Sequence, residues 1–318
     1  MSISIIIIIG FLGFFALYFG GEILVTGTVN TAKKLKIPPH LIAVTVIAFG
    51  TSSPELFVSV NAVFKGSPDI AWGNVIGSNI ANLLLVIGCA SILAPLVSNS
   101  TSIIKDLFWM MLSTTLFIIA AYSLNGINLI IGVIFIIILF LILLIMSSQI
   151  KKNNFVDMQE NNPTIVLNYT VSPFIVTIIG ILIILIGSEL LVFSAKNISN
   201  LLSIEESIVG LTIVALGTSL PEVSASIIAT KRGHTDIAIG NVIGSNIFNS
   251  LGILGAAGIA SSPNILLIPK NFLYFDIPIL FLVTLLVCFN IIWLKRISRT
   301  LGIFYILFYL IYLFIIFK

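Results

Sequence analysis

Charged residues are scarce in this chain. Only 8% of its 318 residues are Asp, Glu, Lys or Arg, 58% are hydrophobic, and the mean hydropathy is +1.21. Soluble globular domains carry about 25% charged residues, so this composition excludes that class. Apolar runs of about 20 residues recur along the sequence and predict a membrane protein with many spans. The first run, residues 3–19, lacks the basic flank of a signal peptide, and we expect it to remain as a span.

Cysteine and histidine are equally scarce. Cys89 and Cys288 lie in apolar segments, which excludes a disulfide framework and a thiolate metal site. His40 and His234 are expected in loops, so the apolar segments contain no imidazole ligand. No nucleophile–base pair occurs in these segments either. We therefore expect neither an enzyme nor a bound cofactor.

The apolar sequence contains a polar motif that occurs twice. Residues 48–55 read Ala-Phe-Gly-Thr-Ser-Ser-Pro-Glu, and residues 215–222 read Ala-Leu-Gly-Thr-Ser-Leu-Pro-Glu. Each is followed by Gly-Asn-Val-Ile-Gly-Ser-Asn-Ile-x-Asn, at residues 73–82 and 240–249. The copies are offset by about 167 residues, and roughly 30 of about 70 surrounding positions are identical, which indicates an internal duplication.

The duplication organises the whole chain. We count about ten spans, five on each side of one polar stretch. The prediction is an all-α membrane protein with a first five-helix repeat over residues 1–148, a cytoplasmic linker over 149–169 and a second five-helix repeat over 170–318. Because five is an odd number, the second repeat enters the membrane with opposite polarity. Such inverted-topology repeats are typical of secondary transporters.

The basic residues predict the orientation. Cytoplasmic loops are enriched in Lys and Arg. If the N-terminus is outside, only four of the 15 Lys and Arg residues fall in outside loops, and the other eleven (15 − 4) fall inside. We therefore expect a multi-pass protein of the cell membrane with both termini outside. The four outside residues are Lys65, Lys196, Lys270 and Lys318.

Glu55 and Glu222 are the charged residues of the repeated motif. A carboxylate at membrane depth costs at least about 2.5–3.5 kcal/mol, and neither motif contains a Lys or Arg to pair with it. Two glutamates brought together need protons or a bound cation, and a divalent cation matches their charge. Glu22 and Glu189 lie late in the first span of each repeat, where we favour a structural or gating role over ion ligation.

The other polar side chains of the motif supply only hydroxyl and amide groups. Oxygen coordination with two carboxylates suits calcium, or sodium in several smaller sites, better than zinc or copper. Magnesium is less favoured because it gives up its water reluctantly. The neutral candidates are Thr51, Ser52, Ser78 and Asn82 in the first repeat and Thr218, Ser219, Ser245 and Asn249 in the second.

Backbone features accompany these side chains. Pro54 and Pro221 are expected to break the local helix and to free carbonyl groups within residues 48–51 and 215–218. Asp69 and Asp236 are expected as helix N-caps. The glycines that predict close helix packing are Gly73, Gly77, Gly240 and Gly244. The asparagines for which ligand and interhelical hydrogen-bonding roles both stay open are Asn74, Asn79, Asn241 and Asn246.

The duplicated Gly-Thr-Ser-x-Pro-Glu and Gly-Asn-x-x-Gly-Ser-Asn-x-x-Asn motifs resemble the alpha-repeats of the sodium/calcium exchangers, within the calcium/cation antiporter superfamily. The resemblance is to compact prokaryotic and archaeal members without a large regulatory loop, and it covers essentially the whole chain. It implies ten helices with ion sites midway through the membrane, between the second, third, seventh and eighth helices.

The resemblance also implies roles for individual residues. Glu55 and Glu222 would hold calcium together with Thr51 and Thr218. Sodium ions would use the same glutamates with Ser52, Ser78, Ser219, Ser245 and the carbonyl groups of Ala48 and Ala215. Asn82 and Asn249 would line the centre. Some relatives, including potassium-dependent ones, carry aspartate at the position of Asn249, so asparagine here weakens the case for potassium co-transport.

The sequence therefore predicts an antiporter that exchanges calcium for sodium by alternating access. The alternative on the same fold is a proton-coupled exchanger of calcium or another divalent cation. A channel is disfavoured by the self-contained, pseudo-symmetric site. We expect calcium and sodium ions and the lipid bilayer as the only partners, with no nucleic acid, and nothing in the sequence requires more than a monomer.

Overall fold

The computed structural model describes residues 3–66, 68–97, 101–148, 172–201 and 215–316. The first repeat consists of α1 (Ile3–Leu35), α2 (Pro39–Ile42), η1 (Ala43–Ile47), α3 (Ala48–Thr51), α4 (Ser53–Phe64), α5 (Pro68–Ala81), η2 (Asn82–Val86), α6 (Ile87–Leu93), β1 (Leu96–Val97), α7 (Thr101–Leu124), β2 (Gly126–Ile127) and α8 (Leu129–Ser148). The second consists of α9 (Pro173–Leu201), α11 (Ala215–Thr218), α12 (Leu220–Lys231), α13 (Thr235–Ile247), η5 (Phe248–Ile253), α14 (Leu254–Ala260), β3 (Leu266–Leu267), η6 (Phe272–Asp276), α15 (Ile277–Trp293), β4 (Arg296–Ile297) and α16 (Arg299–Ile316).

The membrane spans follow the predicted pattern. Eight of the described helices are long and apolar enough to cross a bilayer, and the bent pair Pro39–Thr51 and Ser53–Phe64 makes a ninth candidate. The one predicted span that is missing from this count is the seventh along the chain. It overlaps residues 202–214, which lie outside the described residues, as does the predicted linker over 149–169. The chain is thus an all-helical membrane protein, with two short strand pairs in its described part.

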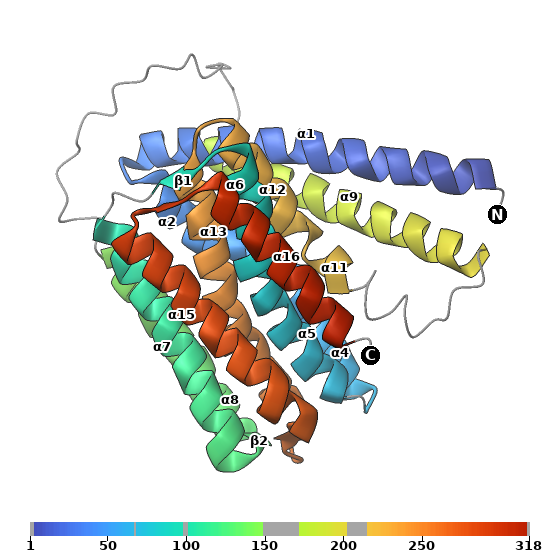
Figure 1. Cartoon of the computed structure of the whole chain (residues 1–318), viewed down its shortest axis with the longest axis vertical. Helices are drawn as coiled ribbons and strands as arrows, with labels where there is room; N and C mark the ends of the chain where they lie inside the picture. Colours follow the sequence, from blue (N-terminus) through green and yellow to red (C-terminus); the bar gives the residue numbers. More distant parts are fainter. Residues whose placement is uncertain (1–2, 67, 98–100, 149–171, 202–214, 317–318) are drawn as a thin grey trace.

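The two longest helices, α1 and α9, lie side by side and cross the top of the bundle in Figure 1. Glycines at equivalent positions of the two repeats allow this approach. A Cβ on Gly20 would lie 2.9 Å from the backbone nitrogen of Ile184, and a Cβ on Gly187 would lie 2.8 Å from that of Leu17. Lipid tails are as apolar as the helix surfaces, so no hydrophobic driving force brings membrane helices together. Close van der Waals contacts of this kind contribute to their association instead.

The span that carries each glutamate is interrupted at the predicted place. The first copy bends by 42° between Thr51 and Ser53. The breaking residues, Ser52 and Ser219, have nearly the same backbone angles, with φ −85°, ψ 9° and φ −87°, ψ 0°. A proline follows in the first turn of α4 and of α12, where its missing N–H costs no intrahelical hydrogen bond.

Two short antiparallel strand pairs join the repeats, which the sequence did not predict. β1 pairs with β4, so that Leu96 lies opposite Ile297, and β2 pairs with β3, so that Ile127 lies opposite Leu266. Each pair therefore ties the connection after the third span of one repeat to the connection between the last two spans of the other.

Three local expectations need correction or refinement. His40 is not in a loop but buried in α2, with its Nε2 3.7 Å from Oδ2 of Asp106 on α7. Asp69 and Asp236 are not N-caps, since each lies inside the first turn of its helix. There a carboxylate still interacts favourably with the helix dipole. Glu22, expected to have a structural or gating role, forms an ion pair with Arg232 at the end of α12.

Candidate cation site

Glu55 and Glu222 occupy equivalent positions in the first turns of α4 and α12. Each is only 1% exposed, so both carboxyl groups are buried in the interior of the helix bundle. Within the described ranges, neither carboxylate forms an ion pair with a Lys or Arg. The interior therefore holds two acidic groups with no fixed positive charge beside them.

Hydroxyl groups reach these carboxylates across the boundary between the repeats. The Ser52 hydroxyl donates to Oε1 of Glu222 at 2.9 Å. Ser245, which belongs to the same repeat as Glu222, donates to that oxygen at 3.4 Å. In the opposite direction, Thr218 hydrogen-bonds the side chain of Glu55. Each carboxyl group is thus completed by residues of the other repeat, and the two motifs form one site.

Asn82 and Asn249 are oriented with their oxygens as the free atoms. The Asn82 amide nitrogen donates to Oδ1 of Asn246 at 3.1 Å, and that of Asn249 donates to the Ser78 hydroxyl at 3.0 Å. Both bonds again cross between the repeats. They leave Oδ1 of each asparagine buried and without a hydrogen-bond partner among the described residues.

Several further buried acceptors of the motif share this property. Buried polar atoms in folded proteins are nearly all hydrogen-bonded, so a group of unpartnered oxygens calls for an explanation. A hard cation is the ligand that such oxygens accept. In the described part of the chain no three His, Cys, Asp or Glu side chains cluster, so a cation would depend largely on neutral oxygens. The unpartnered atoms of the two motifs are Glu55 Oε2, Asn79 Oδ1, Asn82 Oδ1, Ser219 Oγ, Glu222 Oε2 and Asn249 Oδ1.

Further predicted ligands are Ser78 and the carbonyl groups of Ala48 and Ala215. Ser78 accepts the bond from Asn249 and donates to the Val75 carbonyl at 3.2 Å. The Ala48 carbonyl oxygen accepts from the Ser52 amide at 3.0 Å and from the Thr51 hydroxyl at 3.4 Å, so it is less free than expected. Ala215 begins α11.

Short π-helical turns lie beside the predicted ligands. η1 ends directly before Ala48, η2 begins at Asn82, and η5 contains Asn249. A π-turn inserts an extra residue into the helix and frequently marks a functional site. The sequence contains no recognisable signal for these turns, and reasoning from the motif missed them.

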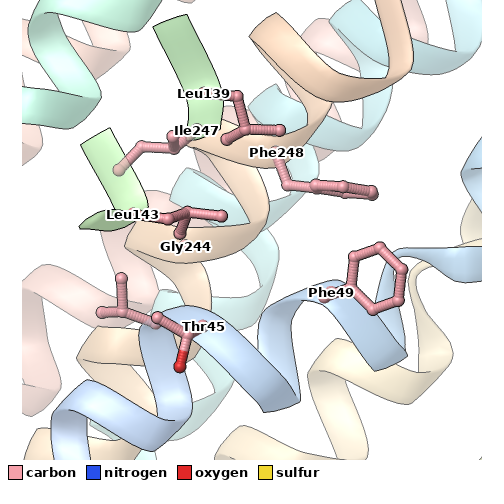
Figure 2. A pocket seen from close by; sticks show the side chains of 8 residues that line it. Thr45, Phe49, Leu139, Leu143, Gly244, Ile247 and Phe248 are labelled. Atoms are coloured by element: carbon pink, nitrogen blue, oxygen red, sulfur yellow. The ribbon is translucent and has the colours of Figure 1, made fainter. Parts of the chain in front are cut away.

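A small pocket lies beside this site but has a different character. Figure 2 shows Thr45 and Phe49 facing Leu143 of α8 and Gly244 and Phe248 of α13 and η5. The rings of Phe49 and Phe248 meet edge to face, with centroids 5.0 Å apart. The Thr45 hydroxyl is bound to the Leu41 carbonyl at 2.7 Å. Because its lining is apolar, this pocket offers no carboxylate or amide to a cation.

Comparison with known proteins identifies the family. The sequence profile described as "Sodium/calcium exchanger protein" matches residues 5–148 and 172–318, almost the whole chain. The chain belongs to the sodium/calcium exchanger family. It is accordingly a cation antiporter of the sodium/calcium exchanger type, and not an enzyme. The predicted membership and the predicted class of function are both confirmed at this level.

Individual relatives agree with this assignment. The uncharacterized membrane protein MJ0091 of Methanocaldococcus jannaschii is 37% identical over 254 residues, 78% of this chain and 80% of that protein. Sodium/calcium exchanger MaX1 of Methanosarcina acetivorans is 28% identical and covered over 99% of both chains. The structure of the sodium–calcium exchanger NCX_Mj soaked with 10 mM Na⁺ and no Ca²⁺ superposes with a TM-score of 0.84, at 30% identity and 98% coverage of each chain.

Proposed function

We propose that this exchanger moves calcium in one direction and sodium in the other, through a site built on Glu55 and Glu222. The observation that carries the proposal is the pair of buried carboxylates with no Lys or Arg partner among the described residues, each hydrogen-bonded by a hydroxyl group of the opposite repeat. The further ligands proposed are Thr51, Ser52, Ser78, Asn82, Thr218, Ser219, Ser245 and Asn249, with the carbonyl groups of Ala48 and Ala215.

The charge of this site supplies the coupling. An empty site with two ionised glutamates is costly to enclose in a low dielectric, so the protein changes its open side only when cations neutralise the pair. One calcium ion or several sodium ions achieve this, but both sets together would leave a buried excess of positive charge. Exchange follows because the return to the first conformation also requires bound cations, so one kind of ion moves inward when the other moves outward. Calcium, strontium and sodium in the names of the NCX_Mj structures support this choice of ions.

The direct test is calcium uptake into proteoliposomes loaded with sodium. With an outward sodium gradient, we expect radioactive calcium to accumulate inside, and we expect no accumulation with equal sodium on both sides. A proton gradient without a sodium gradient serves as the control. Uptake driven by protons alone would contradict sodium coupling and favour the alternative, a proton-coupled exchanger of divalent cations at the same carboxylates.

We also propose that both termini lie outside the cell, with the linker in the cytoplasm. Contacts between the connecting segments agree with the division of the basic residues into an inside and an outside group. The strand pairing of Val97 with Arg296 brings together two connections assigned to the inside, and that of Ile127 with Leu266 brings together two assigned to the outside. The distribution of Lys and Arg then selects the cytoplasmic face.

Reporter fusions check this orientation. Alkaline phosphatase fused after Lys318 is expected to be active, because the enzyme folds only outside the cytoplasm, and green fluorescent protein at the same position is expected to be dark. The same two reporters inserted at residue 157 in the linker should give the opposite result. A fluorescent C-terminal fusion would overturn the proposed orientation.

A further inference from the structure

Asn74 and Asn241 are motif residues whose role the sequence left open. They occupy equivalent positions on α5 and α13, and they make equivalent contacts. The Asn74 amide nitrogen donates to the main-chain carbonyl of Glu55 at 3.0 Å and to the Ser59 hydroxyl at 2.9 Å. The Asn241 amide nitrogen donates to the main-chain carbonyl of Glu222 at 3.5 Å and to the Ser226 hydroxyl at 3.2 Å.

These contacts lie one helical turn from the candidate ligands. Asn241 and Ser245 are four residues apart on α13, and Glu222 and Ser226 are four residues apart on α12, so each pair shares one helix face. The two helices form an antiparallel hairpin. The contact from Ser245 to Glu222 and the contact from Asn241 to Ser226 are therefore successive rungs between them. The contact between Ser245 and Glu222 would lie at the ion, and the contact between Asn241 and Ser226 fixes how α12 and α13 are aligned along their axes.

Asn241 has one further contact that reaches the other repeat. Its Oδ1 accepts a hydrogen bond from the Thr51 hydroxyl at 3.3 Å. Asn241 is fully buried, as is Thr51. A single amide thus joins the backbone of one glutamate to a candidate ligand of the opposite repeat, and it uses both its donor and its acceptor to do so.

We propose that Asn74 and Asn241 are positioning residues, which hold Glu55 and Glu222 at the height of the hydroxyl groups that would complete the ion site. This inference rests on the proposed function. Partners one shell away from a metal ligand are typically worth about 10- to 100-fold in metal affinity. Asn241 has the larger effect of the two, because it also holds Thr51.

The experiment measures calcium affinity and stability separately, with purified full-length protein. Melting curves with and without calcium chloride give the calcium-induced rise in Tm, and sodium-driven uptake gives KM and the maximal rate. For Asn241→Ala we expect about a tenfold or greater increase in the calcium KM and a smaller calcium-induced rise in Tm. Asn74→Ala is expected to change both in the same direction by less. Ser226→Ala, a milder change on the same rung, is expected to raise KM about two- to threefold, and it tests the proposal if Asn241→Ala does not fold.

Asn290→Ala is the matched control. Asn290 is a buried asparagine outside both motifs, and it donates to the Tyr305 hydroxyl at 2.6 Å. Its loss should lower the Tm without calcium and leave KM and the calcium-induced rise unchanged. If Asn241→Ala behaves like this control, the residue only packs helices and the positioning role is wrong. If Glu222→Gln also keeps the full calcium-induced rise, the ion site itself is misplaced, and the positioning proposal is overturned with it.

Discussion

Replacing Glu222 with glutamine is expected to abolish calcium exchange, with sodium-driven uptake reduced by about 100-fold or more, since the loss of a mere outer-shell partner already costs about 10- to 100-fold. The substitution keeps the size of the side chain and an oxygen that can accept from Ser52, now 2.9 Å away. It removes one of the two negative charges. A calcium ion enclosed there would then carry an uncompensated positive charge into a buried site. Glu55→Gln is expected to have the same effect.

Asp276→Asn is the matched control for this prediction. Asp276 is also a buried carboxylate in a spanning segment, and it accepts a hydrogen bond from Tyr312 at 2.8 Å. The asparagine oxygen can accept the same bond, so we expect exchange to persist. Proteoliposome uptake compares the variants at equal protein content. Wild-type exchange by Glu222→Gln would exclude the two-carboxylate site, whereas equal loss in both variants would point to a general effect of removing buried charge.

Most of the architecture could be predicted from the sequence because the signals are local or repeated. Apolar runs identify the spans, and the duplicated motif relates Glu55 to Glu222. Pro54 and Pro221 predict the interruption that the structure places at Ser52 and Ser219. These inferences need only the order and spacing of residues along the sequence.

The contacts between repeats could not be predicted in this way. Spacing within a motif does not reveal that Ser52 bonds Glu222 rather than its own neighbour Glu55, or that Asn249 bonds Ser78. Those pairings depend on how two hairpins pack, which is a property of the assembled bundle. The π-turns at Asn82 and Asn249 were also missed, since the sequence contains no recognisable signal for them. Buried His40 likewise follows a short turn that reads as a loop.

The glycines of the motif show the same limit, because equal sequence positions have unequal surroundings. Gly77 and Gly244 are equivalent, and both were predicted to allow close helix packing. A Cβ added to Gly244 would overlap the Val44 carbonyl oxygen and lie 2.7 Å from the Ala48 Cβ. A Cβ added to Gly77 would meet no atom of the described residues within 4 Å. Of these two glycines, only Gly244 therefore holds its helix directly against the backbone of η1 and the Ala48 side chain of α3 in this conformation.

Gly244→Ala is accordingly expected to reduce the maximal exchange rate by about 100-fold, because displacing a functional group by about 1 Å can cost that much. The neighbouring backbone cannot move aside as a flexible side chain can. The added methyl group would push α13 away from α3, carrying Ser245 away from its 3.4 Å contact with Glu222 and separating the two repeats at the site. Sodium-driven calcium uptake measures the loss, and size-exclusion chromatography establishes that the variant is folded.

Gly77→Ala provides the comparison at the equivalent position. It adds the same methyl group to the same motif, but into space free of described atoms, so we expect less than about a tenfold loss. Equal and severe loss in both variants would mean that the glycines act through the shared motif and not through the contact of Gly244 with Val44. Wild-type exchange by folded Gly244→Ala would mean that the close approach of α13 to α3 is not needed for the site. The predicted order of the two variants follows from the packing of α13 against η1 and α3, since residues 73–80 and 240–247, which contain the two glycines, have the same sequence.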